Sequence, residues 1–215
     1  MTHAVTGLFA QFLKERIQPW FKERGYRQKA NSFGRWVGDQ FLVVNFQTVP
    51  QWIQEDPSQY PFTVNLGVFA RKLHTAFPYK TVPAFPAEHL CHWRERLDAL
   101  VPVSRDPGDP WRGWWGLRDE SQFDSLADEV LGLLATIGLP MLERLSTEEG
   151  LRDYWLEHRS GGVFSDLQAF RYLVVLIRKN GPREELDRLV SEMRTKWKGT
   201  DWESRLENEI QMLGL

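Results

Sequence analysis

Amide side chains recur on one face of two segments that are typical of β-strands. In 40–49 and 62–71, apolar and polar residues alternate, so successive side chains point to opposite faces of a sheet. One face of each segment is apolar, and the other carries Asn45 and Gln47 on the first and Asn65 on the second. Since amides form directional hydrogen bonds, these residues predict a polar sheet face that can bind a ligand or a partner. The alternative is a face that is solvated or covered by a loop, with its amides bonded to nearby backbone.

Two arginines are candidates for the same face. Arg35 lies on the preceding predicted strand, 32–37, and is expected to join the amides. Arg96 follows Glu95 in a segment, 87–100, that is predicted to form a short helix because its apolar residues recur every three or four positions. For Arg96 the alternative is a solvated ion pair, which contributes little to stability.

The densest aromatic cluster contains Trp111, Trp114 and Trp115, with Arg112 and Gly113 between them. An arginine beside tryptophans can stack by a cation–π interaction, and the neighbouring glycine lets the backbone approach closely. One interpretation is a loop that grips a planar or cationic group. The other is a structural plug that seals the sheet where long loops leave the core uncovered.

No metal site, cofactor or catalytic residue is expected. His89 and His92 would share a face of the predicted helix, but Cys91 is rotated away and no further ligand pair follows. The chain also lacks the GxSxG, GxxxxGK[ST] and GxGxxG motifs, which mark a nucleophile elbow, a phosphate loop and a dinucleotide-binding turn. These observations favour binding over catalysis and leave an enzymatic role open.

The front of the chain predicts one helix followed by a small sheet. An amphipathic helix is expected at the N-terminus, with a break or kink before Pro19 and a C-terminal cap at Gly25. The first two strands flank Gly38 and Asp39, a pair suited to a tight hairpin turn, and a third strand follows after a proline-containing loop.

The pattern becomes helical from Ser121 onward, and Pro140 and later glycines divide it into several helices. The last three helices are expected at about 165–179, 183–196 and 201–213, with Trp155, Trp197 and Trp202 sealing the junctions between helices. The predicted fold class is therefore α+β, with an N-terminal helix packed on a small antiparallel sheet of three or more strands and an all-helical C-terminal part. Two domains are expected, 1–145 and 146–215.

Composition is ordinary for a globular protein of 215 residues, with 42% hydrophobic and 26% charged residues and a net charge of −2. Residues 1–100 carry 12 Lys and Arg against 8 Asp and Glu, whereas residues 101–215 carry 15 against 21. This imbalance is far below the basic footprint of nucleic-acid-binding domains, so nucleic acid ranks last among the expected partners. Cys91 is the single cysteine, and no signal peptide or membrane-spanning apolar run is expected. A cytoplasmic protein without membrane contact is therefore predicted.

Five short motifs, taken in order, resemble the bacterial domain-of-unknown-function family 4304. They are Gly25–Lys29 leading to Asn31–Phe33, Val44–Gln47, Phe62–Val68, Cys91–Leu97 and Trp114–Trp115. The resemblance covers about residues 5–145 and leaves the helical C-terminal part as an extension. It implies a compact cytosolic α+β domain with no established activity, so no catalytic residue is carried over from it.

The expected function is the binding of a protein partner, in an accessory or toxin-immunity-type role. The C-terminal helices would be the docking element or the dimer contact, and the oligomeric state is open. The alternative is a small-molecule-binding protein or enzyme that uses the polar sheet face, with Trp114 and Trp115 as a lid.

Overall fold

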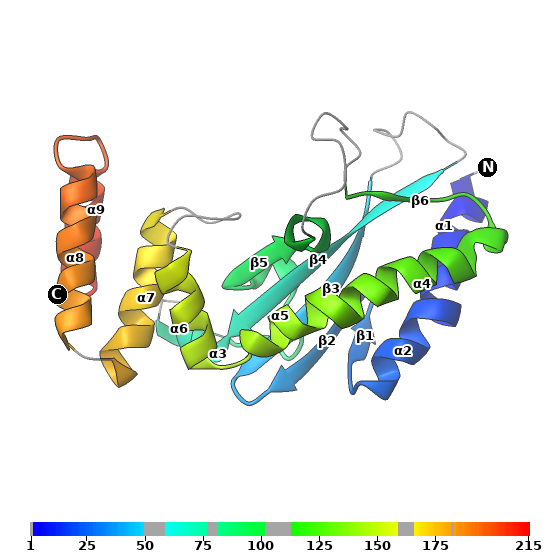
Figure 1. Ribbon diagram of the computed structural model, residues 1–215, viewed down its shortest axis with the longest axis horizontal. Helices are drawn as coiled ribbons and strands as arrows, with labels where there is room; N and C mark the ends of the chain where they lie inside the picture. Colours follow the sequence, from blue (N-terminus) through cyan, green and yellow to red (C-terminus); the bar gives the residue numbers. More distant parts are fainter. Residues whose placement is uncertain (1, 50–58, 77–80, 102–112, 159–165, 182) are drawn as a thin grey trace.

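The computed structural model describes residues 2–49, 59–76, 81–101, 113–158, 166–181 and 183–215. An antiparallel sheet has helices α1–α2 and α4–α5 packed across one face, and helices α6–α9 extend beyond one end of the sheet (Figure 1). The predicted α+β class is confirmed.

The sheet has the strand order β1-β2-β3-β4-β5, and β6 pairs with β4 beside β5. Its strands are β1 Arg27–Lys29, β2 Ser32–Val37, β3 Gln40–Thr48, β4 Tyr60–Ala70, β5 Trp93–Arg96 and β6 Trp115–Leu117. The predicted hairpin turn joins β2 to β3, and Gly38 adopts a φ of +56° there, a conformation that glycine reaches without steric penalty. β3 and β4 form the longest pairing and the centre of the sheet.

Two long helices cross this sheet, and each contains a proline. The first consists of α1 Thr2–Phe12, a π-helical turn Leu13–Ile17 and α2 Gln18–Glu23; the second consists of α4 Phe123–Leu133, a π-helical turn Leu134–Gly138 and α5 Leu139–Arg144. In each turn a backbone N–H bonds five residues back, from Gln18 to Leu13 and from Leu139 to Leu134. The wider turn accommodates Pro19 and Pro140, whose rings would otherwise meet a carbonyl one turn earlier. The break or kink expected before Pro19 therefore takes the form of a π turn within a continuing helix.

Aromatic rings join the helices to the sheet. Phe12 of α1 lies 5.8 Å from Phe62 of β4 and 5.4 Å from Phe123 of α4, measured between ring centroids. The same apolar cluster continues into the C-terminal helices, where Trp93 of β5 meets Tyr154 edge to face at 5.9 Å. The predicted boundary at residue 145 therefore lies within a shared apolar core, and the division into two domains stays a prediction.

The helix predicted over residues 87–100 is wrong. This segment forms a short 3₁₀ turn at Glu88–Leu90, strand β5, and a second 3₁₀ turn at Leu97–Leu100. Because β4 is buried along its length, its backbone needs hydrogen-bond partners on both sides. Pairing of β5 with β4 supplies them and overrides the weak helical periodicity of this segment.

The C-terminal helices lie close to the predicted ranges. They are α6 Glu148–Glu157, α7 Asp166–Asn180, α8 Arg183–Trp197 and α9 Glu203–Met212, and the short α3 Arg71–Ala76 connects the sheet to them. Trp155 and Trp197 are buried as expected. The expectation for Trp202 is wrong, because it is 43% exposed at the start of α9, where the tilted ring of Trp197 lies 5.8 Å from it between ring centroids.

Within the described part of the chain, one helix, Glu120–Arg144, is long and apolar enough to cross a membrane when judged by length and composition alone. A helix that covers the core of a water-soluble protein has the same properties. Phe123, Ala127 and Val130 of this helix are buried in the core formed with the sheet.

The buried His92 connects the sheet to the C-terminal helices. Its side chain is 4% exposed, its Nδ1 accepts the backbone N–H of Ala70 at 3.0 Å, and its ring meets that of Tyr172 of α7 at 5.2 Å. Burial, together with the nearby charge of His74, lowers the pKa of His92 from 6.5 to about 3.

We expect this pKa to make stability depend on pH. The unfolded chain protonates His92 below about pH 6.5, whereas the folded chain resists protonation until about pH 3, so the contribution is full above 6.5 and is lost as pH falls toward 3. Between pH 6.5 and 4, the free energy of unfolding should fall by about 2–3 kcal/mol more in the wild type than in His92→Asn, which keeps an acceptor but does not titrate. Urea unfolding at a series of pH values measures this. The exposed His89 serves as the control, because the free energy of unfolding of His89→Asn should change with pH as it does in the wild type. The prediction is contradicted if the free energy of unfolding of His92→Asn falls with pH as steeply as that of the wild type.

Candidate functional site

The register of the sheet aligns five polar residues across the strands. Lys29 lies opposite Ser32, Ser32 opposite Asn45, Asn45 opposite Asn65, and Asn65 opposite Arg96. Directly paired residues of an antiparallel sheet point to the same face. These five residues, which we call the polar row, therefore share the face opposite the one that α1 and α4 cover.

Two amides of the polar row are held by side-chain hydrogen bonds. Asn45 Nδ2 donates to Ser32 Oγ at 2.9 Å, and Asn65 Nδ2 donates to Gln47 Oε1 at 2.7 Å. Asn65 is only 8% exposed, whereas Gln47 is exposed above it. Among the described residues, Asn45 Oδ1 and Gln47 Nε2 have no partner. Asn45 of the row and the neighbouring Gln47 thus offer one acceptor and one donor on the same face of the sheet.

The β5 end of the row is fixed by a compact cluster. Arg96 Nε donates to Asp98 Oδ1 at 2.9 Å, and the guanidinium lies 5.6 Å from the ring centroid of the half-buried Trp114. Gly113 packs directly against both charged side chains, and its carbonyl accepts a hydrogen bond from Thr63 Oγ1 at 2.8 Å. Because Asp98 partly neutralises Arg96, this end of the row carries little net charge.

The structure places Asn45, Gln47 and Asn65 on one face, as the strand alternation predicts. It also brings Arg96 into line with them, although through strand β5 and not through the predicted helix. The functional role of these four residues stays a prediction.

The expectation that Arg35 joins this face is wrong. Arg35 lies opposite Leu42, so its side chain points to the helix-covered face, where its guanidinium pairs with Glu143 and lies 5.0 Å from the ring of Tyr26. The face of Arg35 could have been predicted from the sequence, because a two-residue turn at Gly38 and Asp39 fixes the register of β2 against β3.

Trp115 is likewise not a lid over the polar row. It is 4% exposed, stacks on Phe62 at 5.7 Å within the core, and donates from Nε1 to Glu129 at 2.9 Å. Strand β6 sets this orientation, because pairing of Trp115 with Phe62 puts both rings on the same face of the sheet. Trp114 points to the polar row instead, and Trp111 lies outside the described residues.

Sequence reasoning missed Lys29, Ser32, Thr63 and Asp98. Lys29 and Ser32 meet through the short hairpin of β1 and β2, which turns at Ala30 with a φ of +50°. Three-residue strands such as β1 leave no periodic signal, so only the register reveals these neighbours.

Two side chains with raised pKa values, Glu95 and Cys91, are not members of the polar row. Burial raises the pKa of Glu95, while the backbone N–H of Arg96 opposes that shift, but Glu95 lies opposite Leu66 and faces the helix-covered side. Cys91 is a buried free thiol whose pKa burial also raises. In the described ranges there is no cluster of three or more His, Cys, Asp or Glu that could hold a metal ion. The polar row is thus suited to hydrogen bonding and charge recognition.

Residues 17–144 match the family model described as a domain of unknown function, DUF4304. The chain belongs to the DUF4304 family. The match includes the whole sheet, from β1 to β6; the first π turn ends at the first matched residue, and the second lies within the match. Neither curated proteins nor solved structures give a match to this chain. In this DUF4304 protein, α6–α9 lie beyond the matched residues and form an additional helical part.

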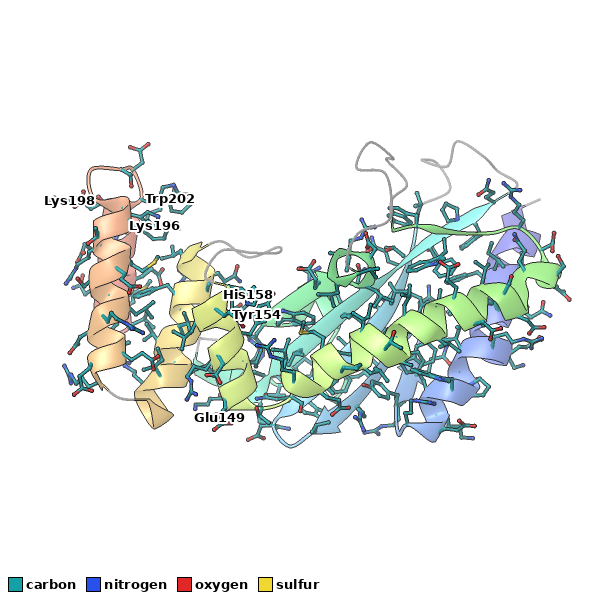
Figure 2. The ribbon with its side chains drawn as sticks, in the orientation of Figure 1. Glu149, Tyr154, His158, Lys196, Lys198 and Trp202 are labelled. Carbon is teal, nitrogen blue, oxygen red and sulfur yellow. The ribbon has the colours of Figure 1, made fainter. Side chains whose placement is uncertain are left out.

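That helical part presents a second candidate surface. Among the described residues, the large apolar side chains that are exposed are Leu90, Trp202, Met212 and Leu215, and the last three lie on or beside α9. Figure 2 shows Trp202 with Lys196 and Lys198 at the turn between α8 and α9. A groove of about 570 Å³ runs between α7 and α9, lined by Leu167, Arg171, Arg205, Asn208, Glu209, Gln211 and Met212. We call Trp202, Met212, Leu215 and this groove the α9 surface.

We expect Gly113→Ala to loosen the β5 end of the polar row. A Cβ at residue 113 would overlap the Asp98 carboxylate and the Arg96 guanidinium, and the φ of +77° is itself unfavourable for alanine. The substitution should lower the free energy of unfolding by about 2–4 kcal/mol. Gly199→Ala is the matched control, because φ there is +73° with open space around the site. It should lose about 1 kcal/mol; equal losses in urea unfolding would show that packing on Arg96 and Asp98 is unimportant.

Proposed function

We propose that this protein acts by binding a protein partner, in an accessory or toxin-immunity-type role, and not by catalysis. The observation that carries the proposal is the α9 surface. Exposed large apolar side chains that gather on one element of a domain are candidates for an interaction site. Trp202, Met212 and Leu215 are three of the four exposed large apolar side chains of the described residues, and Met212 also lines the groove between α7 and α9.

The α9 surface combines features that protein interfaces favour. Tryptophan, methionine and arginine are enriched at such interfaces, and Arg205 stacks over Trp202 with its guanidinium 4.7 Å from the ring centroid. Arg171 reaches from α7 to pair with the buried Glu209 of α9, which fixes the groove floor before any partner binds. A preformed groove reduces the ordering entropy that association has to overcome.

The proposal also includes a site of self-association and a location in the cytoplasm. The α9 surface is also the expected dimer contact if the chain self-associates. A cytoplasmic location is supported by the single cysteine, Cys91, which is a buried free thiol.

Affinity capture from the native host tests the α9 surface. Immobilised wild-type protein should retain a partner in stoichiometric amount, and Met212→Asp should reduce retention at least about 10-fold because it places a charge in an apolar contact. Leu90→Asp is the matched control, since Leu90 is 41% exposed but lies outside the α9 surface. The proposal fails if nothing is retained, or if Met212→Asp and wild type retain the same protein equally.

A second candidate function is small-molecule binding or catalysis at the polar row. The observation in its favour is the adjacent acceptor and donor on Asn45 and Gln47, with Trp114 nearby as a potential optical reporter. Of the two tryptophans expected to form a lid over the polar row, only Trp114 can do so, because Trp115 is buried in the core.

A ligand screen monitored by tryptophan fluorescence tests this second candidate. Any true ligand should bind Gln47→Ala about 10-fold more weakly, because the exposed amide supplies a hydrogen bond in a partly buried site. Thermal stability should fall by no more than the loss of one hydrogen bond, because Gln47 is exposed and only Asn65 Nδ2 loses its acceptor. A ligand whose affinity is unchanged in Gln47→Ala does not use the polar row.

A further inference from the structure

The β1 edge of the sheet carries an excess of positive charge. Residues 14–29 contain six Lys and Arg against two Glu. Four of the six are exposed and have no carboxylate partner among the described residues: Lys14, Lys22, Arg27 and Lys29. This short region accounts for the basic balance of the front half of the chain.

Two of these cations lie on the same face as the polar row. Lys29 is the first member of the row, and Arg27 lies opposite Gly34, one row away. Gly34 in turn lies opposite Val43, which shares the face of Asn45. Arg27 and Lys29 therefore extend the row to the sheet edge with a pair of exposed charges.

Asn45 in the middle of the row and the neighbouring Gln47 together can hydrogen-bond to one peptide group. A peptide backbone presents one N–H donor and one C=O acceptor per residue. Asn45 Oδ1 can accept the first and Gln47 Nε2 can donate to the second, and neither atom has a partner in the described part of the protein. The hydrogen bonds to Ser32 and Asn65 hold both amides in place for such a contact.

The length of the row suits a short extended segment. Four strand spacings separate β1 from β5, which is about 19 Å. An extended chain covers that distance with about six residues. A carboxylate near one end would meet Lys29 and Arg27, while Arg96 and Trp114 bound the other end.

We propose that the polar row is a docking strip for an extended acidic segment of another protein, which lies across the strands from β1 to β5. This docking strip is separate from the α9 surface and does not depend on it. Charge complementarity selects the acidic segment at the β1 edge, and the amides fix its backbone.

Nucleic acid fits the strip less well. The strip carries two unneutralised cations, whereas a nucleic-acid site relies on many phosphate contacts and on a strongly basic domain. The nearby ring of Trp114 already faces Arg96 and is half-buried, so it offers no open platform for base stacking.

Fluorescence anisotropy on the full chain tests the proposal with a labelled peptide of about a dozen residues that alternates Glu and Ser. Wild-type protein should bind this peptide at low salt and should not bind the same design with Lys in place of Glu. Lys29→Glu should weaken binding at least about 10-fold by reversing a charge that contacts the peptide. Gln47→Ala should weaken it about 3-fold without changing net charge.

Two matched variants distinguish binding at this docking strip from a general effect of net charge and from binding at the α9 surface. Lys198→Glu makes the same charge change on an exposed lysine at the α8–α9 turn, and binding should not change beyond about 2-fold (Figure 2). Met212→Asp should also bind the peptide normally, because it alters only the α9 surface; its loss of partner capture therefore tests the proposed function independently.

Three results of the peptide experiments would overturn the proposal, and a fourth comes from an oligonucleotide control. The three are absence of binding to the Glu–Ser peptide, equal weakening by Lys29→Glu and Lys198→Glu, and binding that survives Gln47→Ala and Lys29→Glu unchanged. A labelled oligothymidine of similar length should bind more weakly than the acidic peptide. Tighter binding of the oligonucleotide would identify the strip as a nucleic-acid site and reject the acidic segment.

Discussion

Nine residue pairs join β3 to β4, from Gln40 opposite Ala70 to Thr48 opposite Phe62, and both strands are buried along most of their length. Side chains alternate along a strand, so a shift of one residue would turn the side chains that face the two long helices to the other side of the sheet. The apolar face of this pair receives the two long helices, and the other face carries the polar row. The positions of the helices, of β5 and of both candidate surfaces therefore follow from this one pairing.

The long helices adapt to the sheet through π turns. A sheet is twisted, and a helix that stays in contact with it over several turns has to curve or change its phase. Leu13–Ile17 and Leu134–Gly138 each insert a wider turn before a proline, and the buried Ile17 and Leu134 stay in the core. Both long helices thus contain a π turn directly before the short helix that carries the proline, and both contribute side chains to the apolar core that continues into the C-terminal helices.

Strand alternation and hairpin chemistry predicted the sheet and the shared face of Asn45 and Asn65, because these signals are local. The expectations for Arg35 and Trp115 were wrong because the face of each depends on a partner strand. The face on which Arg35 lies is set by the pairing of β2 with β3, and the length of the hairpin turn fixes that pairing. The face on which Trp115 lies is set by the pairing of β6 with β4. Because β6 has only three residues, it carries no periodic signal, and the burial of Trp115 was not predictable from local sequence.

The sequence by itself determined the α+β class, the central hairpin, the third strand and the last three helices, since turn residues and hydrophobic periodicity act over a few positions. Tertiary structure alone decided that residues 93–96 are a strand, that one polar residue from each of five strands falls in a single row, and that Trp202 stays exposed. Each of these depends on hydrogen bonds or burial supplied by segments far away in the chain. The backbone N–H and C=O groups of a buried strand edge need hydrogen-bond partners, so a segment that can pair with the edge forms a strand there. An apolar side chain is buried only where another element packs against it.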